Sequence, residues 1–231
     1  MSITENVTRI KEEIARAAIA AGRKPEDILL CAATKMNDAA AVQEAIRAGV
    51  DCCGENRVQE LTLKQSQNAY EGAPVHFIGH LQTNKVKQVV GKVSLIQSVD
   101  SLRLLEAINK EAEKQGVVQD ILLEVNVAKE ESKSGFAMEE VDTVLSRMGD
   151  FPAIRVQGFM AIPPICQIST ENHKFFQKMY NLSVDIMRKK YDNVCVNILS
   201  MGMSGDYADA IACGSTMIRV GTAIFGARDY S

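Results

Sequence analysis

Residues 28–35 read ILLCAATK, and this stretch decides the fold class of the 231-residue chain. The apolar run before the lysine is too continuous for a half-exposed strand and is typical of a parallel strand buried on both faces. Residues 38–48 follow with an Asp at the N-cap position and an apolar helical face, and Gly49 stands at the C-cap position. The sequence therefore predicts a strand-then-helix unit whose strand ends at Lys35.

The same alternation continues along the chain. Helical patterns are clearest at residues 101–114 and 170–190, and no linker rich in Pro, Gly or Ser divides residues 1–231. Eight parallel strands with crossover helices predict an α/β fold, a single (β/α)8 barrel of the TIM type, with a doubly wound open sheet as the alternative. The other seven strands are predicted at 51–55, 75–79, 94–99, 120–127, 154–160, 195–200 and 217–224.

An additional helix precedes the first strand. Residues 2–21 carry apolar side chains at helical spacing, and Gly22 followed by Pro25 supplies a stop. We expect residues 1–22 to pack on the outside of the barrel.

Composition, charge and residue spacing argue against several classes of partner and site. The net charge is -3 and the basic residues are scattered, which argues against a nucleic-acid partner. No apolar run reaches the ~20 residues needed to span a bilayer, and the N-terminus lacks a signal-peptide pattern, so a cytoplasmic location and no membrane partner are expected. The six cysteines are irregularly spaced and are expected to be free thiols. Neither CxxC nor HExxH occurs, so spacing indicates no metal site.

Polar residues follow the strands at the rim where barrel proteins carry their active sites. Residues 199–206 (LSMGMSGD) and 219–222 (RVGT) follow or end the last two predicted strands. Their hydroxyl groups and glycines suit a phosphate, and phosphate sites at this place recur in barrels. Lys35 ends the first strand, where desolvation can lower a lysine pKa and free the amine to attack an aldehyde. A lysine beside a phosphate cradle is the pattern of a pyridoxal 5'-phosphate (PLP) site.

Each of these features also has a purely structural interpretation. Lys35 can be a solvated charge at the rim, and the Gly-rich stretch 201–205 can be a tight connection. His80 can be a structural histidine, and Met201 and Met203 can fill gaps in the core. The vicinal pair 52–53 fits packing into the second strand better than thiol chemistry.

Several longer motifs occur in a specific order along almost the whole chain. They are ATK at 33–35, GENRVQE at 54–60, HFIGHLQTNK at 76–85, SVD at 98–100, KSG at 133–135, LSMGMS at 199–204, and the closing run at 210–228. With these motifs the chain resembles the pyridoxal phosphate homeostasis protein family, whose members are related to the N-terminal barrel of alanine racemase.

The resemblance implies a role for individual residues. Lys35 would hold PLP as a Schiff base, and Arg219 would face the pyridine nitrogen. Asn56 and His80 would line the pocket near the ring. The phosphate would be held by Ser200, Ser204, Gly221 and Thr222, and Met201 is counted among the cofactor-binding residues. The chain departs from the family pattern at Asn37, Arg57 and Val75, where Pro, Tyr and Trp are common, and these departures concern the edges of the pocket.

The resemblance also bears on catalysis. A guanidinium beside the pyridine nitrogen disfavours its protonation and weakens the ring as an electron sink. The chain extends five residues beyond Gly226, and we expect no second domain of the kind that supplies an opposing tyrosine in alanine racemase. The expected function is therefore PLP binding in intracellular PLP homeostasis, in which a monomer supplies or buffers PLP for PLP-dependent apoenzymes without robust catalysis.

Two other functions are open at the level of the sequence. A small PLP-dependent amino-acid racemase using Lys35 and His80 would label the α-carbon of L-alanine in deuterated water and form the D-isomer. A barrel enzyme that forms a Schiff base between Lys35 and a sugar phosphate would be colourless as purified.

Overall fold

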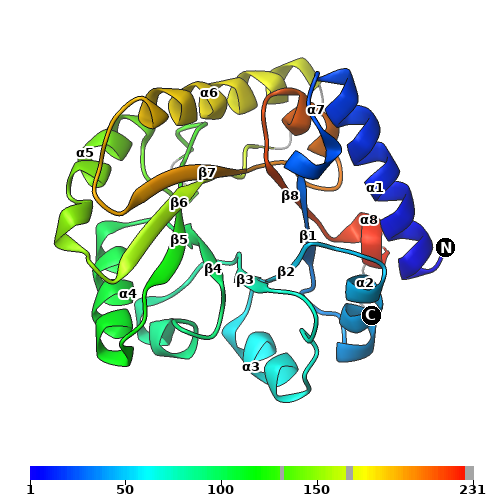
Figure 1. The fold of residues 1–231 in the computed structure, drawn as a ribbon, viewed down its shortest axis with the longest axis horizontal. Coiled ribbons are helices and arrows are strands. Elements are labelled where there is room, and N and C mark those ends of the chain that lie inside the picture. Colours follow the sequence, from blue (N-terminus) through cyan, green and yellow to red (C-terminus); the bar gives the residue numbers. More distant parts are fainter. Residues whose placement is uncertain (131–132, 165–168, 227–231) are drawn as a thin grey trace.

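The computed structural model describes residues 1–130, 133–164 and 169–226. Eight parallel strands close into a barrel in which each strand pairs with the next and β8 pairs with β1, and the helices lie outside it (Figure 1). The predicted (β/α)8 class is confirmed, and closure excludes the open sheet. The strands are β1 (Leu29–Ala33), β2 (Cys52–Glu55), β3 (Val75–Phe77), β4 (Leu95–Val99), β5 (Gln119–Glu124), β6 (Ile154–Met160), β7 (Val194–Ser200) and β8 (Met217–Val220).

Helix α1 and η1 precede β1, α8 follows β8, and the other described helices fall between the strands. None of the described helices combines the length and apolar character that crossing a bilayer requires. The α-helices are α1 (Ile3–Ala20), α2 (Ala39–Arg47), α3 (Val58–Ser66), α4 (Leu102–Gln115), α5 (Val141–Ser146), α6 (Ser169–Met187), α7 (Tyr207–Ala212) and α8 (Thr222–Phe225). The 3₁₀ turns are η1 (Pro25–Asp27), η2 (Thr83–Gln88), η3 (Met138–Glu140) and η4 (Met148–Asp150).

Three predicted strands were too long at their carboxyl ends. The strand predicted at 75–79 ends at Phe77, and the other two extend further beyond their observed ends. The strand predicted at 217–224 ends at Val220, because the carbonyl of Gly221 accepts hydrogen bonds from the amides of Ile224 and Phe225 and so begins the short helix α8. The strand predicted at 120–127 ends at Glu124. In both cases apolar residues beyond the strand are buried without being part of it, namely Val125 and Val127 after β5 and Ile224 in α8.

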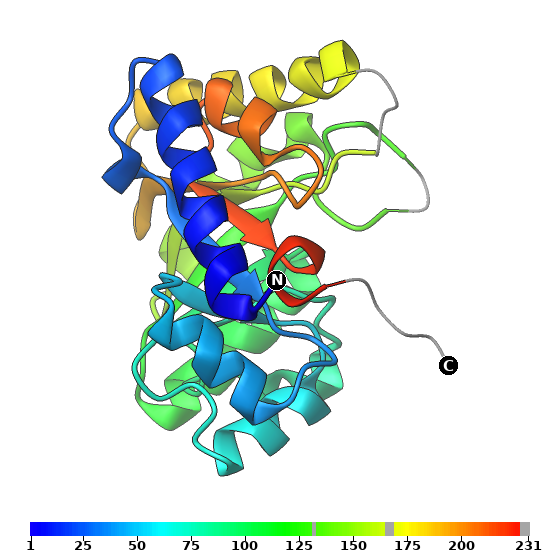
Figure 2. The ribbon, with the colours of Figure 1, turned by 90° about the vertical axis from the view of Figure 1, so that its right-hand side faces the viewer.

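Helix α1 is the predicted element outside the repeat. Ser2 and Glu5 form a capping box at its first turn, and its buried face consists of Val7, Ile10, Ile14 and Ala18. This face packs in one hydrophobic cluster with residues of β1, α7, β8 and α8 (Figure 2). The helix therefore covers the seam where the first and last strands meet.

Side chains fill the inside of the barrel, so a ligand site has to lie at the rim. The interior cluster comprises Cys31, Cys52, Ile78, Leu95, Leu122, Met160 and Met217. The described cysteines are free thiols, as predicted; Cys166 and the motif residues Ala227 and Arg228 lie outside the described residues.

Gly158 marks a close approach between β6 and β7. It has φ +140°, and a Cβ atom at this position would overlap the backbone oxygen of Ile198 in β7. The register between β6 and β7 shifts between Val156 and Gly158. Only glycine allows these two strands to pair closely at this point.

We expect Gly158→Ala to lower the free energy of unfolding by about 3 kcal/mol, because it adds both backbone strain and a steric clash. Urea unfolding followed by circular dichroism measures the change. Gly205→Ala is the matched control, since a Cβ there meets no atom within 4 Å and φ is not in the left-handed region. Equal stability of the two variants would contradict this account of the β6–β7 contact.

Candidate cofactor site

A cavity of about 440 Å³ opens at the carboxyl ends of the strands, and this volume lies within the usual range of small-molecule sites. Its walls come from the ends of β1, β2, β3, β6, β7 and β8 and the residues that follow them. The lining residues are Ala33, Lys35, Asn56, Ile78, Ile162, Asn172, Met203, Ser204, Gly205, Asp206, Arg219, Gly221 and Thr222. Six of the nine predicted site residues are among them.

The backbone around Lys35 is held from two sides. Asn37 donates a side-chain hydrogen bond of 3.0 Å to the carbonyl of Lys35, and the amide of Met36 donates to Glu60 at 2.6 Å. Met36 has φ +63°, a conformation that non-glycine residues rarely adopt. The chain therefore turns sharply after Lys35, and the side chain of Asn37 and the carboxylate of Glu60 fix the turn.

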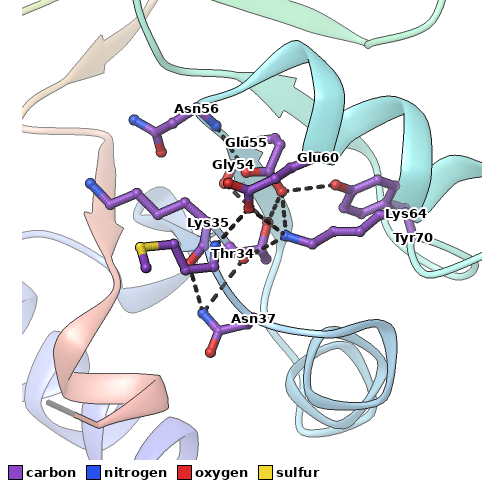
Figure 3. Close-up of polar contacts among 10 residues, drawn as sticks. Thr34, Lys35, Asn37, Gly54, Glu55, Asn56, Glu60, Lys64 and Tyr70 are labelled. Atoms are coloured by element: carbon purple, nitrogen blue, oxygen red, sulfur yellow. Dashed lines mark hydrogen bonds and ion pairs between the residues drawn. The ribbon is translucent and has the colours of Figure 1, made fainter. Parts of the chain in front are cut away.

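A buried ion pair lies directly beneath this turn. Lys64 Nζ is 2.7 Å from Glu55 Oε2, and their side chains are 5% and 0% exposed. Lys64 also donates to the carbonyl of Thr34 at 2.7 Å, and the hydroxyl groups of Thr34 and Tyr70 each lie 3.0 Å from Glu55. Figure 3 shows that Lys35 extends away from this network. The network therefore fixes the end of β1 without using the Lys35 side chain.

We expect Glu55→Gln to destabilise the protein by about 3 kcal/mol, because it removes the closer carboxylate and leaves the buried charge of Lys64 with Glu60 alone, at 3.4 Å. Urea unfolding measures the loss. Glu139→Gln is the control, since it breaks the exposed Lys129–Glu139 pair and should hardly change the unfolding midpoint. A loss no larger than that of the control would show that the buried pair does not hold β1 and β2 together.

Donor groups gather on the β8 side of the cavity. The Oγ of Ser204 lies 3.4 Å from the amide nitrogens of both Gly221 and Ala223, which is long for a hydrogen bond. Thr222, which lies between Gly221 and Ala223 in the sequence, is exposed and adds a second hydroxyl group to the lining. An anion here would meet two weakly used backbone donors and two hydroxyl groups, which is the arrangement predicted for the phosphate.

Arg219 forms the inner wall of the cavity and is only 5% exposed. One guanidinium nitrogen donates to Ser200 Oγ at 2.6 Å and another donates to the carbonyl of Ala161 at 3.0 Å. Burial lowers the pKa of Arg219, and the nearby carboxylates of Glu124 and Asp206 oppose that shift. The guanidinium is thus fixed in direction and faces a cavity that also contains Lys35.

Three predicted residues do not line the cavity. Ser200 is fully buried behind Arg219, where its hydroxyl donates to Gln97 at 2.7 Å. Met201 is fully buried in the hydrophobic core between the barrel and the helices. The side chain of His80 is 62% exposed and pairs with Asp100 at 3.1 Å.

The cavity contains unsatisfied hydrogen-bond acceptors. The side-chain oxygens of Asn56 and Asn172 are buried and have no hydrogen-bond partner, although both residues line the cavity. Such atoms are rare in proteins because leaving them unpaired costs free energy. Figure 3 shows Asn56 extending to the same side as Lys35. An amine, anion donors and unpaired acceptors around one cavity fit PLP, which carries an aldehyde, a phosphate and a phenolic hydroxyl.

The sequence analysis missed Glu124, which does not line the cavity but interacts electrostatically with Arg219 in its wall. Its pKa is raised to about 7, chiefly by burial and then by the charge of Asp100, while Arg219 and His80 oppose the shift. It is the last residue of β5, so a carboxylate directly after the apolar residues 121–123 was the available signal. Asp206 and Asn172 were also missed.

The raised pKa of Glu124 predicts a dependence of stability on pH. The folded protein keeps a proton on this carboxyl group that the unfolded chain releases above pH 4.5, so stability is lost as pH rises through about 7. Relative to Glu124→Gln, wild type should lose on the order of 2 kcal/mol between pH 4.5 and 8. Urea unfolding across this range measures the difference, with the exposed Glu12→Gln as control. Parallel pH profiles for all three proteins would contradict the shift.

Comparison with known proteins gives a consistent result. Residues 2–229 match the family model of the alanine racemase N-terminal domain. The pyridoxal phosphate homeostasis protein of Aquifex aeolicus is 39% identical over 230 residues, which cover 100% of both chains. A structure of an unknown protein from Bifidobacterium adolescentis has a TM-score of 0.92 and 38% identity, covering 96% of this chain and 94% of its own. PipY of Synechococcus elongatus with PLP bound has a TM-score of 0.80 and 31% identity, covering 92% and 100%.

Proposed function

The chain belongs to the pyridoxal phosphate homeostasis protein family, built on the alanine racemase N-terminal domain, and we propose that it binds PLP and serves PLP homeostasis. The observation that carries the proposal is the cavity in which Lys35 meets Arg219, two unpaired amide oxygens and the donors around Ser204. PipY, a relative over nearly the whole chain, has a structure with PLP bound, and this supports the choice of ligand.

Different lining residues bind different parts of PLP in this proposal. The amine of Lys35 is the covalent anchor, while Ser204, Gly221 and Thr222 hold the phosphate. Arg219, fixed by Ser200 behind it, faces the ring nitrogen and keeps it unprotonated. Bound PLP supplies an aldehyde that combines reversibly with an amine. Direct contacts of PLP with Ser200, Met201 and His80 stay predictions.

The lining supports binding and release more than turnover. Its titratable side chains are Lys35, Asp206 and Arg219. The carboxylate of Asp206 accepts a 2.6 Å hydrogen bond from the amide of Met203, and Arg219 is tied to Ser200 and Ala161. Racemisation needs an acid–base group on each face of the substrate, and the described lining residues offer for this, besides Lys35, two groups that already bond their neighbours, Asp206 and Arg219. We further propose that the protein is a cytoplasmic monomer that supplies PLP to apoenzymes and has no robust catalytic activity.

The first test is the visible spectrum of the purified protein. We expect wild type to show a band of bound PLP that borohydride reduction fixes on the peptide containing Lys35, and Lys35→Ala to lose both. Lys87→Ala, which removes an exposed lysine of η2, should behave as wild type. A wild type that stays colourless after incubation with PLP would overturn the proposal, and label fixed on another lysine would overturn the assignment of the anchor.

A further inference from the structure

A second cluster of reactive side chains lies inside the barrel, apart from the residues that line the cofactor cavity. Cys31 in β1, Cys52 in β2 and His76 in β3 each offer one ligand atom, and these atoms all lie within 4.8 Å of one another. The three residues are buried, with exposures of 0%, 2% and 7%. Residues 31, 52 and 76 have no metal-binding spacing along the chain, so only the barrel brings them together.

The strand register explains why they converge. Cys31 and Cys52 are directly paired residues of neighbouring parallel strands, and both belong to the interior cluster. Side chains alternate along a strand, so Cys53 packs instead in the core outside the barrel. Of the vicinal pair, only Cys52 therefore faces Cys31.

We propose that Cys31, Cys52 and His76 bind one Zn²⁺ ion inside the barrel. Two thiolates and an imidazole are an established zinc ligand set, with Zn–S near 2.3 Å and Zn–N near 2.0–2.1 Å. Tetrahedral bonds of this length put ligand atoms roughly 3.3–3.8 Å apart, so small side-chain rotations bring the three atoms to an ion. The two thiolate charges also balance the ion, and a neutral site suits an apolar interior.

Neighbouring residues support such a site. The Nδ1 of His76 lies 3.0 Å from the side-chain amide of Gln97, whose Nε2 is a donor as placed. A metal-binding histidine donates its second ring N–H to an acceptor, so zinc binding through Nε2 requires the Gln97 amide to turn and present its oxygen to Nδ1. Gln97 also contacts Met217 Sδ at 3.1 Å, and Met160 and Met217 belong to the same interior cluster. Soft sulfur atoms and apolar side chains thus surround the cysteines, which favours a thiophilic ion over hard cations such as Mg²⁺.

Burial determines how the ion would be acquired. The thiols have almost no contact with solvent, so zinc has to enter while the barrel folds or opens, and afterwards it should be lost slowly. The site does not depend on the proposed PLP function, because none of its three ligands lines the cofactor cavity.

The test measures metal in full-length protein made in zinc-supplemented medium, purified with a reductant and dialysed against zinc-free buffer. By inductively coupled plasma mass spectrometry we expect about one zinc per wild-type chain, at least a fivefold loss in Cys31→Ser and in Cys52→Ser, and no loss in the control Cys195→Ser. Lys35→Ala should keep its zinc, which separates this proposal from PLP binding. Metal-free wild type, copper in place of zinc, or zinc kept by both cysteine variants would overturn it.

A spectroscopic measurement covers the case in which the cysteine variants fail to fold. Lys35→Ala protein refolded with Co²⁺ alone should show near-ultraviolet sulfur-to-cobalt charge-transfer bands, which Zn²⁺ abolishes when it is present during refolding. The Lys35→Ala background avoids overlap with PLP absorption. Refolded protein without these bands would overturn the proposal.

Discussion

The pairing of β1 with β8 is the contact on which the rest of the structure depends. It puts Cys31 opposite Arg219 and Ala32 opposite Val220, although nearly the whole chain separates the two strands. The same pairing brings the end of β1, with Lys35, beside the start of α8, where Gly221 approaches Ala33. Helix α1 covers this seam from outside, so the element that precedes the repeat stabilises the contact that forms the cofactor cavity.

A second constraint is the polar content of the barrel. Arg219, Ser200, Gln97 and His76 form one continuous chain of hydrogen bonds across the interior. A buried guanidinium is tolerated only with such partners, because an unpaired charge in an apolar core is costly. These hydrogen bonds connect Arg219 at the cofactor cavity with His76 in the cysteine cluster. The two proposed sites therefore share one hydrogen-bond network.

The site also balances fixed and available groups. Glu55 and Lys64 form an ion pair beneath the turn that follows β1. The side-chain oxygens of Asn56 and Asn172, in contrast, have no hydrogen-bond partner at the cavity. The ion pair holds the turn in place, and the two amide oxygens remain able to accept hydrogen bonds from a ligand. Rigid support beneath unsatisfied ligand-facing groups is what a preorganised binding site requires.

The sequence by itself determined the order of strands and helices and which residues lie at the carboxyl ends of the strands. Apolar runs such as the one that ends at Lys35 predicted parallel strands. The carboxyl ends of parallel strands share one rim, so Asn56, Ser204, Gly221 and Thr222 could be expected near Lys35. Local pattern failed where an apolar run continues past a strand, as after Val220.

Tertiary structure alone decided which side chains reach the cavity. Met201 turned into the core, His80 faced Asp100 and solvent, and the burial that raises the pKa of Glu124 appeared only once the barrel closed. The convergence of Cys31, Cys52 and His76 has the same origin. Distances between residues on different strands depend on the register and curvature of the closed sheet, and these are set by packing of the whole barrel, which spacing along the chain does not encode.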